Sequence, residues 1–200
     1  MISASDGGRL TGMRWLALLS MLVGSLASAQ EPTPANGAPA TERRTATEYV
    51  RKLQTALTAL ATGDTAQATG TLREAIATAP DQAAGHCHLG SALRRSGDTA
   101  GALESFRTCA RLARQHADAL NEGRGLLGVA QVLVLDTAQR DAAREAVSAL
   151  LRFAETHPSV YPLELAQRLQ QALDSIIELD AVSAEVRQRR EERAAQQARE

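Results

Sequence analysis

The sequence predicts an all-α fold, and three observations support this expectation. Only 2% of the 200 residues are aromatic, while Ala and Leu are abundant. Such small aliphatic side chains suit closely packed helices better than sheets. A twelve-residue pattern recurs at an offset of 34 residues, and apolar residues elsewhere follow helical spacing. No stretch is a run of β-branched residues typical of a strand.

The repeated pattern spans residues 62–73 and 96–107 and describes a turn between two helices. Gly63 and Gly97 fall where a helix ends and a residue able to adopt positive φ is favoured. The following Asp64 and Asp98, or the Thr after each, are able to accept hydrogen bonds from the first free N–H groups of the next helix. The small Ala68 and Ala102 allow the two helices to approach closely, and the larger Leu72 and Phe106 fill the next layer. Pro80 closes the first unit, because helices usually stop just before a proline.

A 34-residue unit with two helices and this residue order resembles the tetratricopeptide repeat. The resemblance covers two units, 49–82 and 83–116. In the second unit the matching residues are Leu89, Gly90, Leu93, Ala102, Phe106 and Cys109. In the first they are Ala56, Ala68, Leu72, Ala75 and Pro80. Arg114 stands where the closing proline is usual, so the second helix of that unit is expected to run on toward His116.

A third, more degenerate unit is expected over 117–158. Its first helix spans 117–135, with Leu120, Leu127, Ala130 and Val134 at helical spacing, although three glycines, Gly123, Gly125 and Gly128, weaken the prediction of a continuous helix. Its second helix spans 141–156 and stops before Pro158, with an expected inward face of Ala142, Ala146, Ala149, Leu150 and Phe153. The resemblance thus implies a superhelix of about three hairpins.

Residues 159–200 are expected to form a long C-terminal helix, because no Gly or Pro occurs from Leu163 onward. An apolar stripe is expected to cover the last hairpin, as terminal repeats require: Leu163, Ala166, Leu169, Leu173, Ile176, Ile177 and Leu179. After Val186 the chain has mixed charge and almost no large apolar residue. We interpret this end as a solvated helix, with a partner-binding or coiled-coil role as the alternative.

The first 29 residues have the three parts of a secretory signal. Arg9 and Arg14 precede an apolar run over 15–26, and Ala27-Ser28-Ala29 predicts cleavage before Gln30. The apolar run is shorter than the ~20 residues that a spanning helix needs, so no stable membrane insertion is expected after cleavage. The prediction is a periplasmic or secreted protein. Residues 30–44, rich in Pro and Ala, are expected to be a disordered leader.

Charge argues against nucleic acid as a partner. The formal net charge is −1, and removing residues 1–29, which hold Arg9, Arg14 and Asp6, lowers it to −2. A chain without basic excess has no general attraction for a polyanion.

Cys87 and Cys109 fall on the two helices of one hairpin. In an oxidising compartment they are able to form a disulfide, and the alternative is two buried, unreactive thiols. A metal site built from His86, Cys87, His88, Cys109 and His116 is not expected. Adjacent helical residues point about 100° apart, so His86 and His88 do not both face one ion. The motifs of nucleotide-binding, hydrolase and zinc-protease sites are missing from the sequence, so neither an enzyme nor a cofactor is predicted.

The resemblance places Arg94, Arg95, Asn121 and Arg124 on the inner surface of the superhelix, where they would form a basic patch suited to an acidic segment. The alternative is that these arginines are merely solvated. Tetratricopeptide domains that clamp a C-terminal carboxylate use Asn and Lys, and Ser91 stands in place of the key Asn.

Three functional hypotheses follow. The first is a non-catalytic scaffold or adaptor that binds a segment of another bacterial envelope protein. The second is a structural protein that self-associates into a homo-oligomer through its C-terminal helix. The third, based on the cluster from His86 to His88, is an accessory subunit of an exported enzyme or a metal-handling protein.

Overall fold

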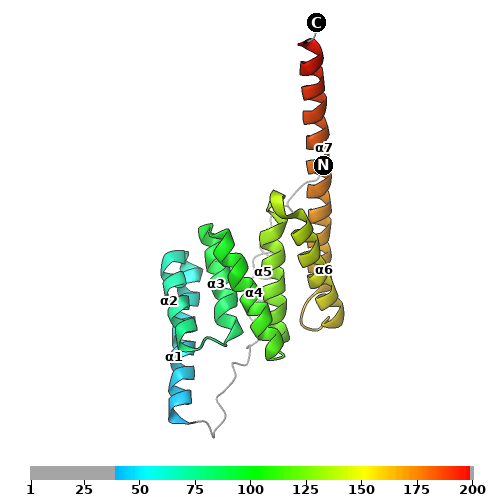
Figure 1. Cartoon of the computed structure of the whole chain (residues 1–200). Coiled ribbons are helices and arrows are strands. Elements are labelled where there is room, and N and C mark those ends of the chain that lie inside the picture. Colours follow the sequence, from blue (N-terminus) through cyan, green and yellow to red (C-terminus); the bar gives the residue numbers. More distant parts are fainter. Residues whose placement is uncertain (1–38, 199–200) are drawn as a thin grey trace, which may run out of the picture. The chain divides into compact units, whose positions relative to one another are not determined.

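The computed structural model describes residues 39–198, and these residues are all-α, without strands. Their seven α-helices are α1 (Ala40–Thr62), α2 (Thr65–Thr78), α3 (Ala83–Ser96), α4 (Thr99–Gln115), α5 (Ala119–Val134), α6 (Arg140–Thr156) and α7 (Leu163–Gln197), with a short 3-10 helix, η1 (Thr137–Gln139), before α6. Successive helices pack against each other in chain order, so that each hairpin rests on the next (Figure 1). Among the described residues, no helix is both long and apolar enough to cross a membrane.

The two turns of the repeated pattern have the same geometry. Gly63 and Gly97 adopt left-handed conformations, with φ of 85° and 86°. The carboxylates of Asp64 and Asp98 each accept a 2.9 Å hydrogen bond from the backbone N–H three residues later. The expected helix stop and helix start are therefore confirmed, and the aspartates rather than the threonines cap the helices.

The first helix begins earlier than expected. The predicted leader extends to residue 44, but α1 starts at Ala40, directly after Pro39. Ala40-Thr41-Glu42-Arg43-Arg44 contains good helix formers, and a proline before the first turn removes no helical hydrogen bond. The rest of the predicted leader and the predicted signal, residues 1–38, lie outside the described residues.

In the second unit, α4 ends at Gln115 with His116 as its C-terminal cap, in agreement with the missing proline. In the third unit, α5 is one continuous helix despite its three glycines. A Cβ atom at Gly128 would lie 2.3 Å from Cδ1 of Phe106, and one at Gly125 would lie 2.6 Å from the backbone N of Ala110. Gly125 and Gly128 therefore let α5 approach α4 closely.

The expected inward face of α6 is wrong by one residue over its first two turns. Ala143, Val147, Leu150, Phe153 and Ala154 are buried, whereas Ala142, Ala146 and Ala149 are only partly buried. The reason is that α6 is covered on one side by α5 and α7. Val147 is buried in the contact with these helices. Ala142, Ala146 and Ala149 lie at the side of this contact.

The last helix, α7, packs against α6 through the expected stripe up to Ile177. Leu173 and Ala166 are buried, but Leu179 is exposed, contrary to expectation. A salt bridge of 2.7 Å between Arg140 and Asp180 ties α7 to the start of α6 just beyond this stripe. Residues 181–197 continue the helix and are all exposed, and Figure 1 shows this end of α7 extending beyond α6.

Candidate partner-binding surfaces

Of the two arginines predicted on α3, one is engaged within the domain. Arg95 donates from Nη1 to the carbonyl oxygen of Leu60 at 2.9 Å, in the last turn of α1, and this oxygen also accepts from the backbone N–H of Gly63 at 3.3 Å. Arg94 is exposed, and it makes no ion pair or side-chain hydrogen bond within residues 39–198. Arg95 therefore links neighbouring hairpins, and Arg94 is left available.

Asn121 is buried in the first turn of α5 and is also engaged. Its Nδ2 donates to Asp118 at 2.7 Å, and its Oδ1 accepts from Nη1 of Arg124 at 3.2 Å. Asp118 in turn caps α5 by accepting from the backbone N–H of Asn121. The amide orients its neighbours instead of facing solvent, so the four predicted residues do not form one free basic patch.

The two cysteines are paired. Cys87 and Cys109 form a disulfide between α3 and α4, with their Cα atoms 5.2 Å apart, and both are buried. The carbonyl oxygen of Asn121 lies 3.5 and 3.3 Å from the two sulfur atoms. The bond therefore joins the helices of the second hairpin at the level where α5 rests on them.

His88 follows the disulfide-bonded Cys87 on α3. Burial, followed by the positive charge of Arg124, lowers its pKa from 6.5 to about 4, so the ring is neutral at pH 7. The Nε2 atom of His86 lies 3.0 Å from the carbonyl oxygen of Pro80. Within residues 39–198, no three His, Cys, Asp or Glu side chains are grouped so as to hold a metal ion.

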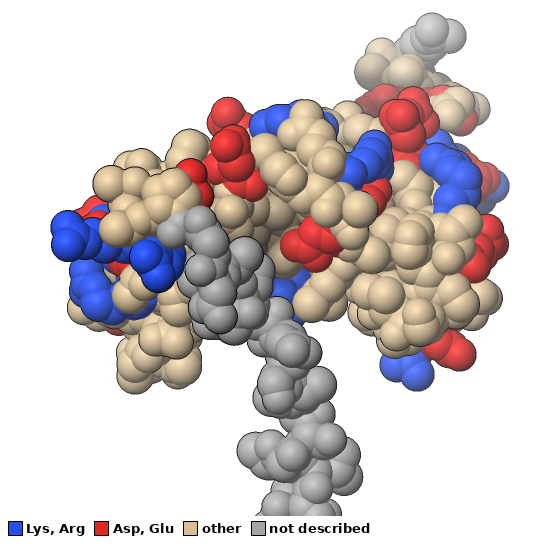
Figure 2. Space-filling view, turned by 90° about the horizontal axis from the view of Figure 1, so that it is seen from below, with Lys and Arg blue, Asp and Glu red and all other residues tan. Residues whose placement is uncertain are grey.

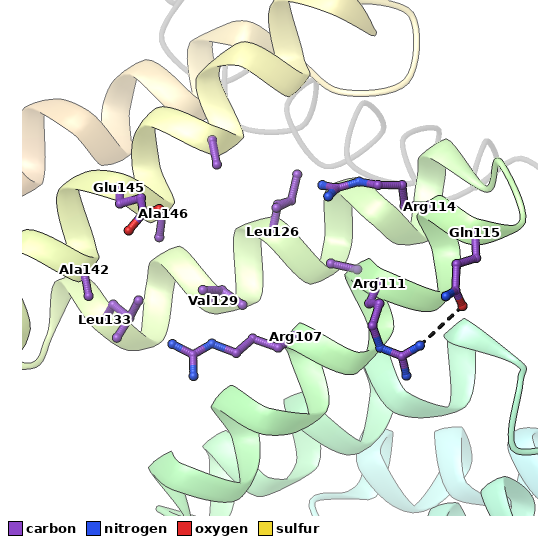
Figure 3. Close-up of a pocket in the computed structure, with 12 residues that line it drawn as sticks. Arg107, Arg111, Arg114, Gln115, Leu126, Val129, Leu133, Ala142, Glu145 and Ala146 are labelled. Atoms are coloured by element: carbon purple, nitrogen blue, oxygen red, sulfur yellow. Dashed lines mark hydrogen bonds between the residues drawn. The ribbon is translucent and has the colours of Figure 1, made fainter.

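One surface feature is not predicted by the sequence analysis. A groove of about 500 Å³ lies between α4 and α6, with α5 as its floor (Figure 3). We call it the α4–α6 groove. Its floor is apolar, and the α6 wall is built from small residues. The lining residues are Arg107, Ala110, Arg111, Arg114 and Gln115 of α4, Leu126, Val129 and Leu133 of α5, and Ala142, Glu145, Ala146 and Ala149 of α6.

One edge of the α4–α6 groove is basic. Arg107, Arg111 and Arg114 follow one another along α4 at spacings of four and three residues, which places them on one side of the helix. Arg111 donates to Gln115 at 3.3 Å, and Arg114 forms a 2.7 Å salt bridge with Glu122. Arg107 makes no ion pair within residues 39–198. The opposite wall carries one acid, Glu145, so the lining is positive on balance.

Elsewhere on the surface, acidic and basic side chains lie among one another. Figure 2 shows acidic and basic side chains interspersed over the face seen there, with basic side chains gathered at the end where α1 lies. Arg43, Arg44 and Arg51 line a shallow hollow on that helix, together with Glu48. That hollow belongs to one helix and is lined by no apolar residue, so the α4–α6 groove is the better candidate.

Two sequence patterns correspond to the walls of the groove. The three arginines on α4 and the alanines at 142, 146 and 149 each follow helical spacing. Spacing alone favours a core position for the alanines and gives the arginines of α4 no distinct role. Only the packing of α6 shows that its alanine row is partly buried at the edge of the core and also lines the α4–α6 groove.

Comparison with models of known families gives no match to this chain, and comparison with curated proteins gives none either.

Proposed function

We propose that the chain is a non-catalytic interaction protein of the tetratricopeptide type, which holds a segment of another protein of the bacterial envelope. The 34-residue repeat supports the family, and the apolar run before Ala27-Ser28-Ala29 supports export to the periplasm or beyond. Catalysis is not proposed, since the sequence carries no nucleophile, phosphate-loop or metal motif.

The observation that carries the proposal is the α4–α6 groove. Its apolar floor is open between two helices, and its alanine wall allows another backbone to approach closely. Exposed apolar surface bordered by charge is typical of a docking site for an amphipathic segment. This replaces the surface around Asn121 as the main candidate, because that amide is engaged within the domain.

Site-specific crosslinking in the native envelope tests the proposal. A photoreactive side chain at Ala146 or Ala142 would lie in the groove, and one at Gln67 on the exposed side of α2 provides the matched control. We expect the same protein to be crosslinked reproducibly from both groove positions and not from the control. A groove that captures nothing beyond the control would contradict the proposal.

The projecting end of α7 favours a second candidate function, self-association through the C-terminal helix. Leu179, Val182 and Val186 are exposed large apolar residues on this helix. Sedimentation of the chain from residue 30 with and without residues 181–200 tests it. A strict monomer in both forms would exclude this second function.

A further inference from the structure

The exposed end of α7 has a single apolar row that nothing in its own domain covers. Leu179, Val182 and Val186 are 66%, 56% and 45% exposed, and spacings of three and four residues place them on one side of the helix. Asp180 points toward its own domain, where it binds Arg140 at 2.7 Å. At about 100° per residue, the apolar row is turned well away from that contact.

Acidic residues flank this row on one side. Glu178 and Glu185 are seven residues apart, so they lie on the same side of the helix, next to the apolar row. Glu185 pairs with Arg189 only within the helix, in an exposed contact that contributes little. Residues 178–186 are therefore an acidic amphipathic segment. We call them the tail segment.

The α4–α6 groove has the complementary pattern. The apolar residues of its floor are Leu126 and Val129, which are partly buried, and Leu133, of which 2% is exposed. They are spaced by three and four residues, as in the row of the tail segment. Arg107 and Arg114 at its edge are seven residues apart, as are Glu178 and Glu185. Seven residues of helix are about 10 Å in both cases, so the lengths of the two patterns agree.

We propose that the α4–α6 groove receives the tail segment of a second copy of this chain. In one of the two possible directions, the apolar row lies on the α5 floor and the glutamates face the arginines of α4. Ser183, a small residue on the side of the row opposite the glutamates, then lies toward the alanine wall of α6. The same chain is unable to supply the segment, because α7 is continuous from Leu163 to Gln197 and each of its residues after Asp180 is exposed to solvent.

This contact joins two different surfaces, so it is heterologous. Two copies close into a dimer if each inserts its tail segment into the other's groove. The inference rests on the groove being a docking surface, as proposed above. An envelope partner of the groove would then compete with the tail segment and share its acidic, amphipathic character.

Charge reversal tests the pairing in the chain from residue 30, measured by sedimentation equilibrium over a range of concentrations. Arg107→Glu with Arg114→Glu should weaken association by about tenfold or more, and so should Glu178→Arg with Glu185→Arg, because like charges then face each other. All four substitutions together should restore association. The matched control is Arg94→Glu with Arg152→Glu, two exposed arginines outside the groove, which should have no effect.

A second variant tests the apolar part. Val182→Ser with Val186→Ser should abolish association and leave the helical circular dichroism spectrum unchanged, because both residues are exposed in the monomer.

Three results would overturn the inference. These are a monomer at every concentration, an oligomer that the groove substitutions leave intact, and a fourfold variant that does not recover association. Envelope crosslinks from Ala146 in a monomeric protein would reject this inference and leave the proposed function standing. A dimer that depends on the groove, in a protein that gives no envelope crosslinks from Ala146, would support this inference and contradict the proposed function.

Discussion

Gly128 of α5 lies directly against the ring of Phe106 of α4. A Cβ atom at position 128 would come within 2.3 Å of Cδ1 of the ring, and one at Gly90 of α3 would come within 2.8 Å of the same atom. Three helices therefore meet around one aromatic side chain, which belongs to a core cluster shared by the first two hairpins and α5. At position 128, helix propensity favours alanine over glycine, whereas packing against the ring favours glycine. The packing effect is the larger of the two.

Gly128→Ala should destabilise the domain. The substitution gains up to about 1 kcal/mol of helix propensity, but forcing a methyl group against the ring costs about 1–3 kcal/mol. We expect a net loss of roughly 1–2 kcal/mol in the free energy of unfolding, measured by urea denaturation. The control is Gly70→Ala in α2, where no atom lies within 4 Å of the added Cβ and stability should rise. Equal effects at both sites would contradict the packing argument.

Removal of the disulfide should lower stability substantially. Cys87 and Cys109 are separated by 22 residues, and a loop of this size contributes about 3 kcal/mol by restricting the unfolded chain. Replacing both residues with Ala, or adding reductant to the native protein, should lower the denaturation midpoint similarly. Reductant should have no effect on the double variant. An unchanged midpoint in reduced native protein would contradict a structural role for the bond.

His88 should make the fold sensitive to acid. Its pKa in the folded state is lowered from 6.5 to about 4, so the unfolded state binds more protons between these pH values. Stability is therefore lost as the pH falls through this window, and His88→Gln should flatten the dependence. NMR titration of the ring measures the pKa directly.

Arg124 contributes to this shift through its charge, as the second cause after burial. Arg124→Gln should raise the pKa of His88 toward 6.5, and Arg94→Gln, which removes the same charge elsewhere on the surface, should not. A pKa of His88 that does not respond to Arg124→Gln would assign the whole shift to burial.

Tyr161 offers a stabilising substitution. Its hydroxyl is buried without a hydrogen-bond partner among residues 39–198, and burial raises its pKa to about 12. Its ring packs edge-on against Phe153, with centroids 6.3 Å apart. Tyr161→Phe keeps this contact and removes the unsatisfied group, so stability should stay equal or rise by about 1 kcal/mol. Tyr161→Ala, which removes the ring, should cost roughly 3 kcal/mol. A large loss for Tyr161→Phe would show that the hydroxyl has a partner.

Local features are predictable from the sequence because their causes are local. A glycine able to adopt positive φ, followed by a carboxylate that caps the next helix, determines the turns at Gly63 and Gly97 regardless of what packs around them. The extent of α4 past Arg114 likewise depends on a missing proline. The start of α1 is harder to predict because its first residues follow a Pro- and Ala-rich stretch without a break in composition, although Pro39 is compatible with the helix that follows it.

The face of α6 that is buried cannot be determined from spacing alone. Ala142, Ala143, Ala146 and Val147 permit two adjacent inward faces, and the positions of α5 and α7 decide between them. The same holds for Asn121, which resembles a ligand-binding residue in the sequence but donates to Asp118 at the start of α5.

The sequence by itself determined the helices, their turns and the pairing of neighbours, since these depend on backbone conformation, capping and residue spacing within about 34 positions. Only the tertiary structure decided which surfaces stay open. The α4–α6 groove exists because three helices leave a row of alanines and a row of arginines on either side of an apolar floor. The tail segment is exposed because α7 extends beyond α6. Each depends on the relative placement of helices, which a one-dimensional pattern does not contain.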